Sequence, residues 1–207
     1  MNITLQEISQ LASILGSLAV IGVFLQIRLT RKQLKADHER SRREKSVELL
    51  LEWTKNLKEN TSLARKIVES LDDEQTRNLF NQEDVKISKK YDNALKKILS
   101  INDADELKEE NDFIILSGKS VSKLRWYVMS YLNMLESILV AWQYSIVDRE
   151  IIEHQFSYLF FPEQGHEALK NFRVAAGGEK SFPVIEIFTN HLEEQRRKIL
   201  KEKSEIA

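Results

Sequence analysis

The sequence predicts an all-α protein: an N-terminal transmembrane helix that continues into a polar stalk helix, followed by an irregular bundle of helices. Two observations predict this class. The 207 residues include only 6 glycines and 2 prolines, and neither type occurs between Gly22 and Gly118. That interval is instead rich in Lys, Glu, Leu and Ala, which favour helices. Apolar residues of the later segments also recur at the spacing of one helix face.

The first element is a transmembrane anchor over residues 1–27. The twenty residues from Ile8 to Ile27 carry no charge. As a helix rising about 1.5 Å per residue, they match the roughly 30 Å hydrocarbon layer of a bilayer. No Lys or Arg precedes this segment and no small-residue cleavage site follows it, which argues against a cleaved signal peptide. We therefore expect this helix to stay in the membrane, where small residues spaced four apart would allow a helix–helix contact.

Residues 28–46 predict a basic juxtamembrane stalk. Eight Lys and Arg residues against three Asp and Glu residues give this stretch a net charge of +5. Because cytoplasmic flanks carry the Lys and Arg excess, we expect the N-terminus outside the inner (cytoplasmic) membrane and the rest of the chain inside. Seven basic side chains are expected to face anionic lipid headgroups: Arg28, Arg31, Lys32, Lys35, Arg40, Arg42 and Arg43. The alternative is that these charges only set the topology.

Residues 47–207 predict a cytoplasmic α-helical domain, because amphipathic spacing begins at Val47. Side chains that can cap a helix N-terminus occur at Thr61, Asp72 and Asp148. Pro183 fits the first turn of a last helix, whose inward face is expected to hold Ile185, Phe188, Leu192 and Ile199. Residues 88–99 are expected to be helical, 102–111 a loop or short surface helix, and 113–116 either helix or strand.

The core of this domain is predicted around residues 126–147. Glu136 is the only charge in the segment, and thirteen of the seventeen aromatic residues lie between Phe113 and Phe188. Large aromatic side chains dominate the apolar surface that a domain buries. The alternative is that the segment is a second membrane span, although a central Glu costs about 2.5–3.5 kcal/mol on insertion.

The order of these segments resembles a known group of proteins. An uncharged anchor is followed by the stalk QIRLTRKQLKADHERSRREKSVELLLEW and then by YLNMLESILVAWQYSIVDREIIEHQF and a terminal helix. This order resembles a bacterial family of membrane-anchored proteins classified only as a domain of unknown function. The resemblance implies an inner-membrane, helical, cytoplasm-facing protein, with defence-related or mobile gene neighbourhoods. It implies no catalytic residues.

The composition excludes several classes of function. There are no cysteines, which removes disulfides, cysteine-ligated zinc and thiol nucleophiles. Lys plus Arg (31) nearly equals Asp plus Glu (32), which argues against a dedicated nucleic-acid binder. We expect no cofactor, no metal and no specific nucleic acid as partner.

Three residues are weak catalytic candidates. Glu136 lies in an apolar helix and therefore needs a hydrogen-bond donor or a cation, for which Lys123, Arg125, Arg149, Arg173 and His154 are available. It is either a structural buried carboxylate or a base with a raised pKa. Arg149 and His154 have the spacing of helical ribonucleases, although such spacing also arises by chance. A single E-x-x-H motif, Glu163 to His166, is too little for a di-iron site.

These features predict a membrane-tethered interaction or sensor module, non-enzymatic, at the cytoplasmic face. Its expected partners are anionic lipid at the stalk and either a protein or a second copy of the chain, with an exposed patch at Tyr158, Phe160 and Phe161. The alternative is an effector, either a ribonuclease using Arg149 and His154 or a two-span membrane-perturbing protein.

Overall fold

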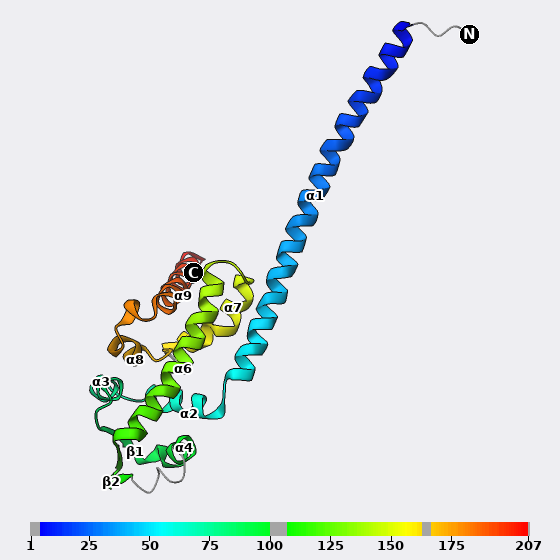
Figure 1. Ribbon diagram of the computed structural model, residues 1–207. Helices are drawn as coiled ribbons and strands as arrows, with labels where there is room; N and C mark the ends of the chain where they lie inside the picture. The colour runs from blue at the N-terminus through cyan, green and yellow to red at the C-terminus, as the bar shows by residue number, and fades with distance from the viewer. Residues whose placement is uncertain (1–4, 100–106, 163–166, 207) are drawn as a thin grey trace.

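The structure is a computed structural model, shown in Figure 1. It describes the backbone of residues 5–99, 107–162 and 167–206, and the side chains of these residues from 21 to 204. The helices are α1 (Leu5–Asn56), α2 (Glu59–Val68), α3 (Asp73–Asn81), α4 (Asp92–Ile98), α6 (Gly118–Gln143), α7 (Arg149–Phe156), α8 (Lys170–Ala175) and α9 (Pro183–Ile206). The strands are β1 (Val85–Ser88), β2 (Lys108–Glu110) and β3 (Phe113–Leu116). The protein is therefore mostly helical, as the sequence predicts, with a small sheet.

Helix α1 is a rod that stands away from the rest of the molecule (Figure 1). It runs without a break from the predicted anchor through the stalk and into the folded domain. Its last turns dock on that domain: Ser46 is fully buried and Trp53 is 8% exposed. The domain thus begins near residue 46, close to the predicted boundary. The side chains of most of the predicted anchor, residues 1–20, lie outside the described part of the chain.

The described residues contain no helix that combines the length and the apolar character needed to cross a membrane. This bears on the predicted alternative of a second span at residues 126–147. Most of that segment lies in α6, which packs inside the domain against α2 and α9. Eleven side chains of α6, including Tyr131, Leu135 and Trp142, are buried by other parts of the chain. The segment is a core helix.

The core is built around α6, as the aromatic distribution predicts. Trp53 from the end of α1 contacts the ring of Tyr131 edge-on at 5.5 Å and that of Phe156 at 5.1 Å. Trp142 contacts Phe188 of α9 at 4.8 Å. Edge-to-face aromatic pairs at these distances add to the hydrophobic effect of burial. They join α1 and α9 to the central helix, and α7 to α1.

A three-stranded antiparallel sheet is the main departure from the predicted all-α fold. Its order is β1-β3-β2, with Val85 opposite Leu116 and Lys108 opposite Ile115. Val85 and Ile87 turn inward, while the outer side carries a Lys86–Glu110 ion pair at 2.9 Å. The predicted helix over 88–99 is therefore wrong at its start, because Ser88 ends β1 and α4 begins only at Asp92.

The predicted caps are mostly confirmed. Asp72 forms a capping box with Gln75, and the Asp148 carboxylate accepts from the backbone N–H of Glu150 at 3.1 Å. Pro183 occupies the first turn of α9. The Thr61 cap is wrong, since α2 begins at Glu59 and its N-cap is Lys58, three residues before Thr61.

One predicted inward side chain is also misplaced. Ile199 is 51% exposed, because α9 continues beyond the body of the domain, whereas Ile185, Phe188 and Leu192 are buried.

Candidate functional site

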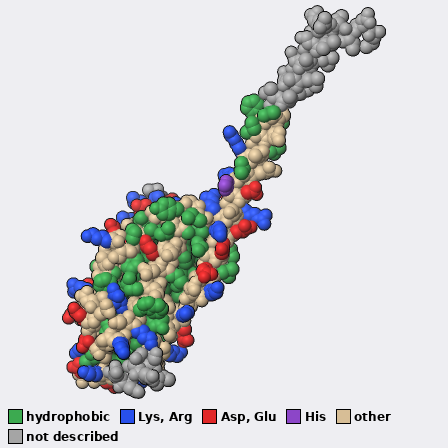
Figure 2. All heavy atoms as spheres, in the orientation of Figure 1, with side chains coloured by type: hydrophobic (Ala, Val, Ile, Leu, Met, Phe, Trp, Pro, Cys, Tyr) green, Lys and Arg blue, Asp and Glu red, His purple; other side chains and the backbone are tan. Residues whose placement is uncertain are grey.

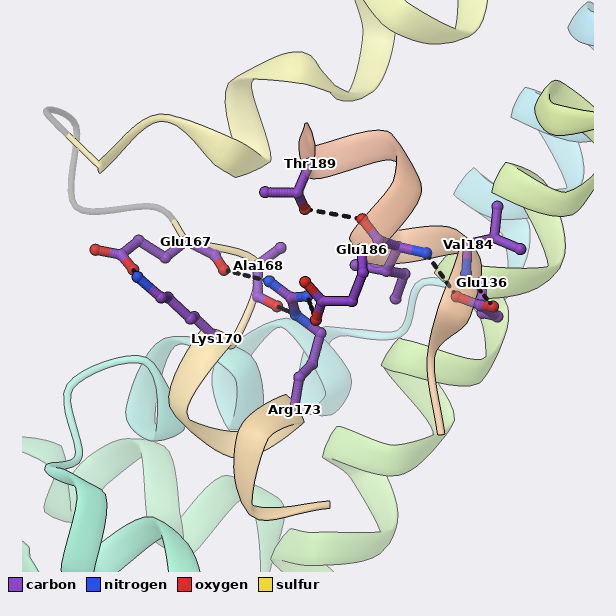
Figure 3. A network of polar contacts seen from close by, with 9 residues as sticks. Glu136, Glu167, Ala168, Lys170, Arg173, Val184, Glu186 and Thr189 are labelled. Atoms are coloured by element: carbon purple, nitrogen blue, oxygen red, sulfur yellow. Dashed lines mark hydrogen bonds and ion pairs between the residues drawn. The ribbon is translucent and has the colours of Figure 1, made fainter. Parts of the chain in front are cut away.

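Glu136 caps the N-terminus of α9 from the neighbouring helix α6 (Figure 3). Phe182, which precedes α9, has no side-chain oxygen with which to cap it, and Pro183 has no N–H. The two Glu136 carboxylate oxygens instead accept from the backbone N–H groups of Val184 at 2.8 Å and Ile185 at 2.9 Å. A carboxylate is stabilised there by both hydrogen bonds and the positive end of the helix dipole. The donor that the sequence requires is therefore backbone, at a site that holds two helices together.

Arg173 extends this network on the other side of α9 (Figure 3). Its guanidinium is 2% exposed and donates to the carboxylate of Glu186 and, at 3.0 Å, to the carbonyl of Ala168. Burial lowers the pKa of Arg173, and the negative charges of Glu186 and Glu136 oppose that change. Of the predicted partners of Glu136, Arg173 thus interacts with its charge, whereas the carboxylate accepts hydrogen bonds from the backbone of α9. The arrangement supports a structural role for Glu136.

Arg149 and His154 lie on different faces of α7. Five residues on an α-helix correspond to a rotation of about 140°. The Arg149 guanidinium lies over the ring of Trp142, 4.2 Å from its centroid, while His154 is exposed. The structure does not bring the two side chains to one position at which a phosphate could be held and protonated.

A polar cluster at Glu153 was not predicted. Its carboxylate accepts from Trp142 Nε1 at 2.9 Å and from Gln195 Nε2 at 3.1 Å, and His191 Nε2 lies 3.1 Å away. His191 follows Phe188 by three residues and therefore lies on the same inward face of the last helix. That spacing is the sequence signal that could have predicted its place in the cluster. The cluster joins α6, α7 and α9, and its contacts satisfy the carboxylate.

The predicted aromatic patch does not form as one surface. Tyr158 is 45% exposed, but Phe160 is 5% exposed and belongs to the core. The ring of Phe161 is covered by Arg196, whose guanidinium lies 4.2 Å from its centroid. The predicted E-x-x-H pair, Glu163 and His166, falls outside the described residues. Within the described ranges, no group of three or more His, Asp or Glu side chains converges on a possible metal position.

The basic stalk divides into two parts. Arg40 forms an ion pair with Glu44 at 2.9 Å, and Arg43 reaches Asp148 of the domain at 3.3 Å. The basic residues nearer the anchor (Arg28, Arg31, Lys32 and Lys35) are exposed, and Arg42 is half-buried beside the domain. Of the seven predicted headgroup-facing side chains, Lys35, Arg40 and Arg43 therefore form ion pairs with other described residues.

A hydrogen-bonded joint fixes the stalk to the domain. The Ser46 hydroxyl donates to the carbonyl of Arg42 at 2.9 Å and accepts from the backbone N–H of Asp148 at 2.9 Å. Asp148 in turn caps α7 and pairs with Arg43. The end of α1 and the turn before α7 are thereby held in one orientation.

Comparisons with family models, curated proteins and solved structures find no match to this chain.

Proposed function

We propose that this chain is a membrane-tethered, non-enzymatic helical module, in which α1 anchors the folded domain to a bilayer and holds it at the cytoplasmic face for interaction with a partner. The observation that carries the proposal is the distribution of apolar side chains on α1. Ile21, Phe24 and Leu25 lie on one side of the helix, and Val23 and Ile27 on the opposite side. All five are 45–70% exposed.

A bilayer explains this distribution better than a protein partner does. A partner helix covers one stripe of apolar residues and leaves the other faces polar. Lipid surrounds a helix and favours apolar residues on every side. The charge pattern agrees, since basic residues begin at Arg28, and Figure 2 shows blue Lys and Arg side chains next to the green apolar side chains on the described part of the rod. Arg31 lies about 6 Å further along the axis than Ile27, within the headgroup region.

The domain is the part of the chain that we propose to bind a protein partner or a second copy. Trp126 is 62% exposed and Tyr144 is 70% exposed. Exposed aromatic residues are enriched at protein interfaces. Tethering confines such a surface to the membrane plane and raises its effective concentration toward other membrane-bound proteins.

Alkaline carbonate extraction tests the tether. The full chain is expected to remain in the membrane pellet. The double variant Ile21→Asp, Leu25→Asp is expected to be extracted more readily, because a charged side chain in the hydrocarbon layer costs up to about 3 kcal/mol. Val47 and Leu51 offer a matched control, with the same spacing on the same helix and similar exposure. Recovery of the unmodified chain in the supernatant would contradict the proposal, as would equal extraction of the two double variants.

A further inference from the structure

An open groove of about 680 Å³ lies between α1 and the turn that joins α6 to α7. Figure 1 shows this turn beside α1, on the side of the domain from which the rod rises. One wall is a row of α1 side chains, Arg31, Lys35, His38 and Arg42, with Leu34 beside them. The opposite wall is formed by Ser145 and Ile146. The groove is within the size range of small-molecule sites.

The four α1 residues form a single stripe. Their spacing of four, three and four residues keeps them within about 60° around the helix axis and spreads them over about 16 Å along it. Arg31 and Arg42 make no ion pair with any described residue, and Lys35 has only Glu39, at 4.0 Å. Carboxylates are absent from the described lining of the groove. It therefore presents positive charge that no described carboxylate pairs at its two ends, Arg31 and Arg42.

The apolar wall is held in place. Ser145 has a positive φ of 53°, and its backbone N–H donates to the carbonyl of Trp142 at 3.1 Å. The backbone N–H of Ile146 donates to the carbonyl of Ala141 at 3.0 Å. The next anchor is Asp148, which is bonded to Ser46 and Arg43. Ile146 nevertheless remains 55% exposed. A preformed wall lowers the entropy lost when a ligand binds.

We propose that this groove binds a ligand with two or more phosphate groups, held by Arg31, Lys35 and Arg42, with an apolar portion against Leu34 and Ile146. Arg is suited to phosphate because its planar guanidinium donates two parallel hydrogen bonds, and Lys adds a point charge. A row of cations about 16 Å long exceeds the reach of one phosphate and fits a ligand with several. The chemistry is shared by cardiolipin, whose headgroup carries two phosphodiesters joined by glycerol, and by soluble diphosphates. In a helix that stands upright in the bilayer the lipid headgroup reaches only the Arg31 end of the row, because Arg42 lies about 22 Å further along the axis than Ile27. The lipid source rests on the proposed membrane tether, whereas the soluble source does not.

The test uses the full chain, which has no native cysteine. Tyr144→Cys carries an environment-sensitive dye next to the groove, and the chain is placed in nanodiscs of phosphatidylcholine. A saturable spectral shift on titration with inorganic pyrophosphate supports a soluble ligand. A shift already present in discs that contain cardiolipin, and unchanged by pyrophosphate, supports the lipid.

Matched variants separate a built site from general attraction. In the dye-labelled chain, Lys35→Ala with Arg42→Ala is expected to weaken binding by roughly tenfold or more, because charge-assisted contacts are lost. Lys32→Ala with Arg40→Ala removes the same charge from other faces of α1 and is expected to leave binding nearly unchanged. Lys32 lies nearer the anchor than Lys35, so general attraction to a membrane predicts the reverse order. An equal loss in both pairs, or no shift with either ligand, would overturn the proposal. A chain that separates from the discs would instead contradict the tether, and the pyrophosphate titration would still be carried out on it.

Discussion

Replacement of Glu136 tests whether this carboxylate is a structural cap. Glu136→Ala removes the acceptor of two backbone N–H groups, at Val184 and Ile185, which are 6% and 0% exposed. A buried donor left without a partner costs about 1–3 kcal/mol. We therefore expect the free energy of unfolding to fall by about 2–4 kcal/mol. Glu136→Gln keeps one acceptor oxygen and should lose about half as much.

The measurement is urea unfolding of the full chain in a mild detergent, followed by tryptophan fluorescence. Trp53 and Trp142 are buried in the domain, so the emission reports its tertiary structure. Glu194→Ala, an exposed position on α9, serves as the control and should change the stability little. A loss below about 1 kcal/mol for Glu136→Ala would refute the capping argument, since one unsatisfied N–H alone should cost that much.

Three further substitutions have defined outcomes. Burial raises the pKa of Tyr131, so the folded state holds this proton more tightly than the unfolded state. The contribution of Tyr131 to stability should be constant below the ordinary tyrosine pKa of about 10 and decline above it. Tyr131→Phe should remove that decline and stabilise the fold by about 1–2 kcal/mol, because the buried hydroxyl has no hydrogen-bond partner among the described residues. An unchanged pH profile in urea titrations would contradict this. Glu186→Gln should lower the free energy of unfolding by about 2–3 kcal/mol, because Arg173 stays buried with less compensating charge, and a neutral effect would contradict the pairing. Asp148→Ala should cost about 1–2 kcal/mol in the same assay through the lost α7 cap, whereas Asp148→Asn, which keeps a capping oxygen, should cost less.

Features that depend on neighbouring residues were predictable from the sequence. The caps at Asp72 and Asp148 and the start of α9 at Pro183 follow from the chemistry of one turn. The continuity of α1 follows from the absence of helix-breaking residues after Gly22. In each case the atoms that decide the structure lie within four residues of one another.

Features that depend on distant contacts were not predictable. The strands β1 and β2 have four and three residues, and β2 consists of Lys and Glu, so neither shows an apolar alternation long enough to identify. Their pairing with β3 decides their conformation. The sequence shows that Glu136 needs a hydrogen-bond donor or a cation. Its donor is the backbone N–H of Val184, 48 residues away, and a backbone donor leaves no pattern of side chains in the sequence.

The groove illustrates both cases. Its row of basic residues on α1 can be read from the spacing of Arg31, Lys35 and Arg42. The opposite wall depends on how the turn between α6 and α7 packs beside α1, which brings Ile146 to that row. The same packing pairs Arg43, which stays exposed, with Asp148.

The most direct test of the tether is the topology of the chain in intact cells. The absence of native cysteines allows single substitutions at Asn2 and at Ser204, an exposed position near the end of α9. A membrane-impermeant maleimide is expected to label Asn2→Cys in intact cells and Ser204→Cys only after lysis. Labelling of Ser204→Cys without lysis would contradict a domain held at the cytoplasmic face by α1.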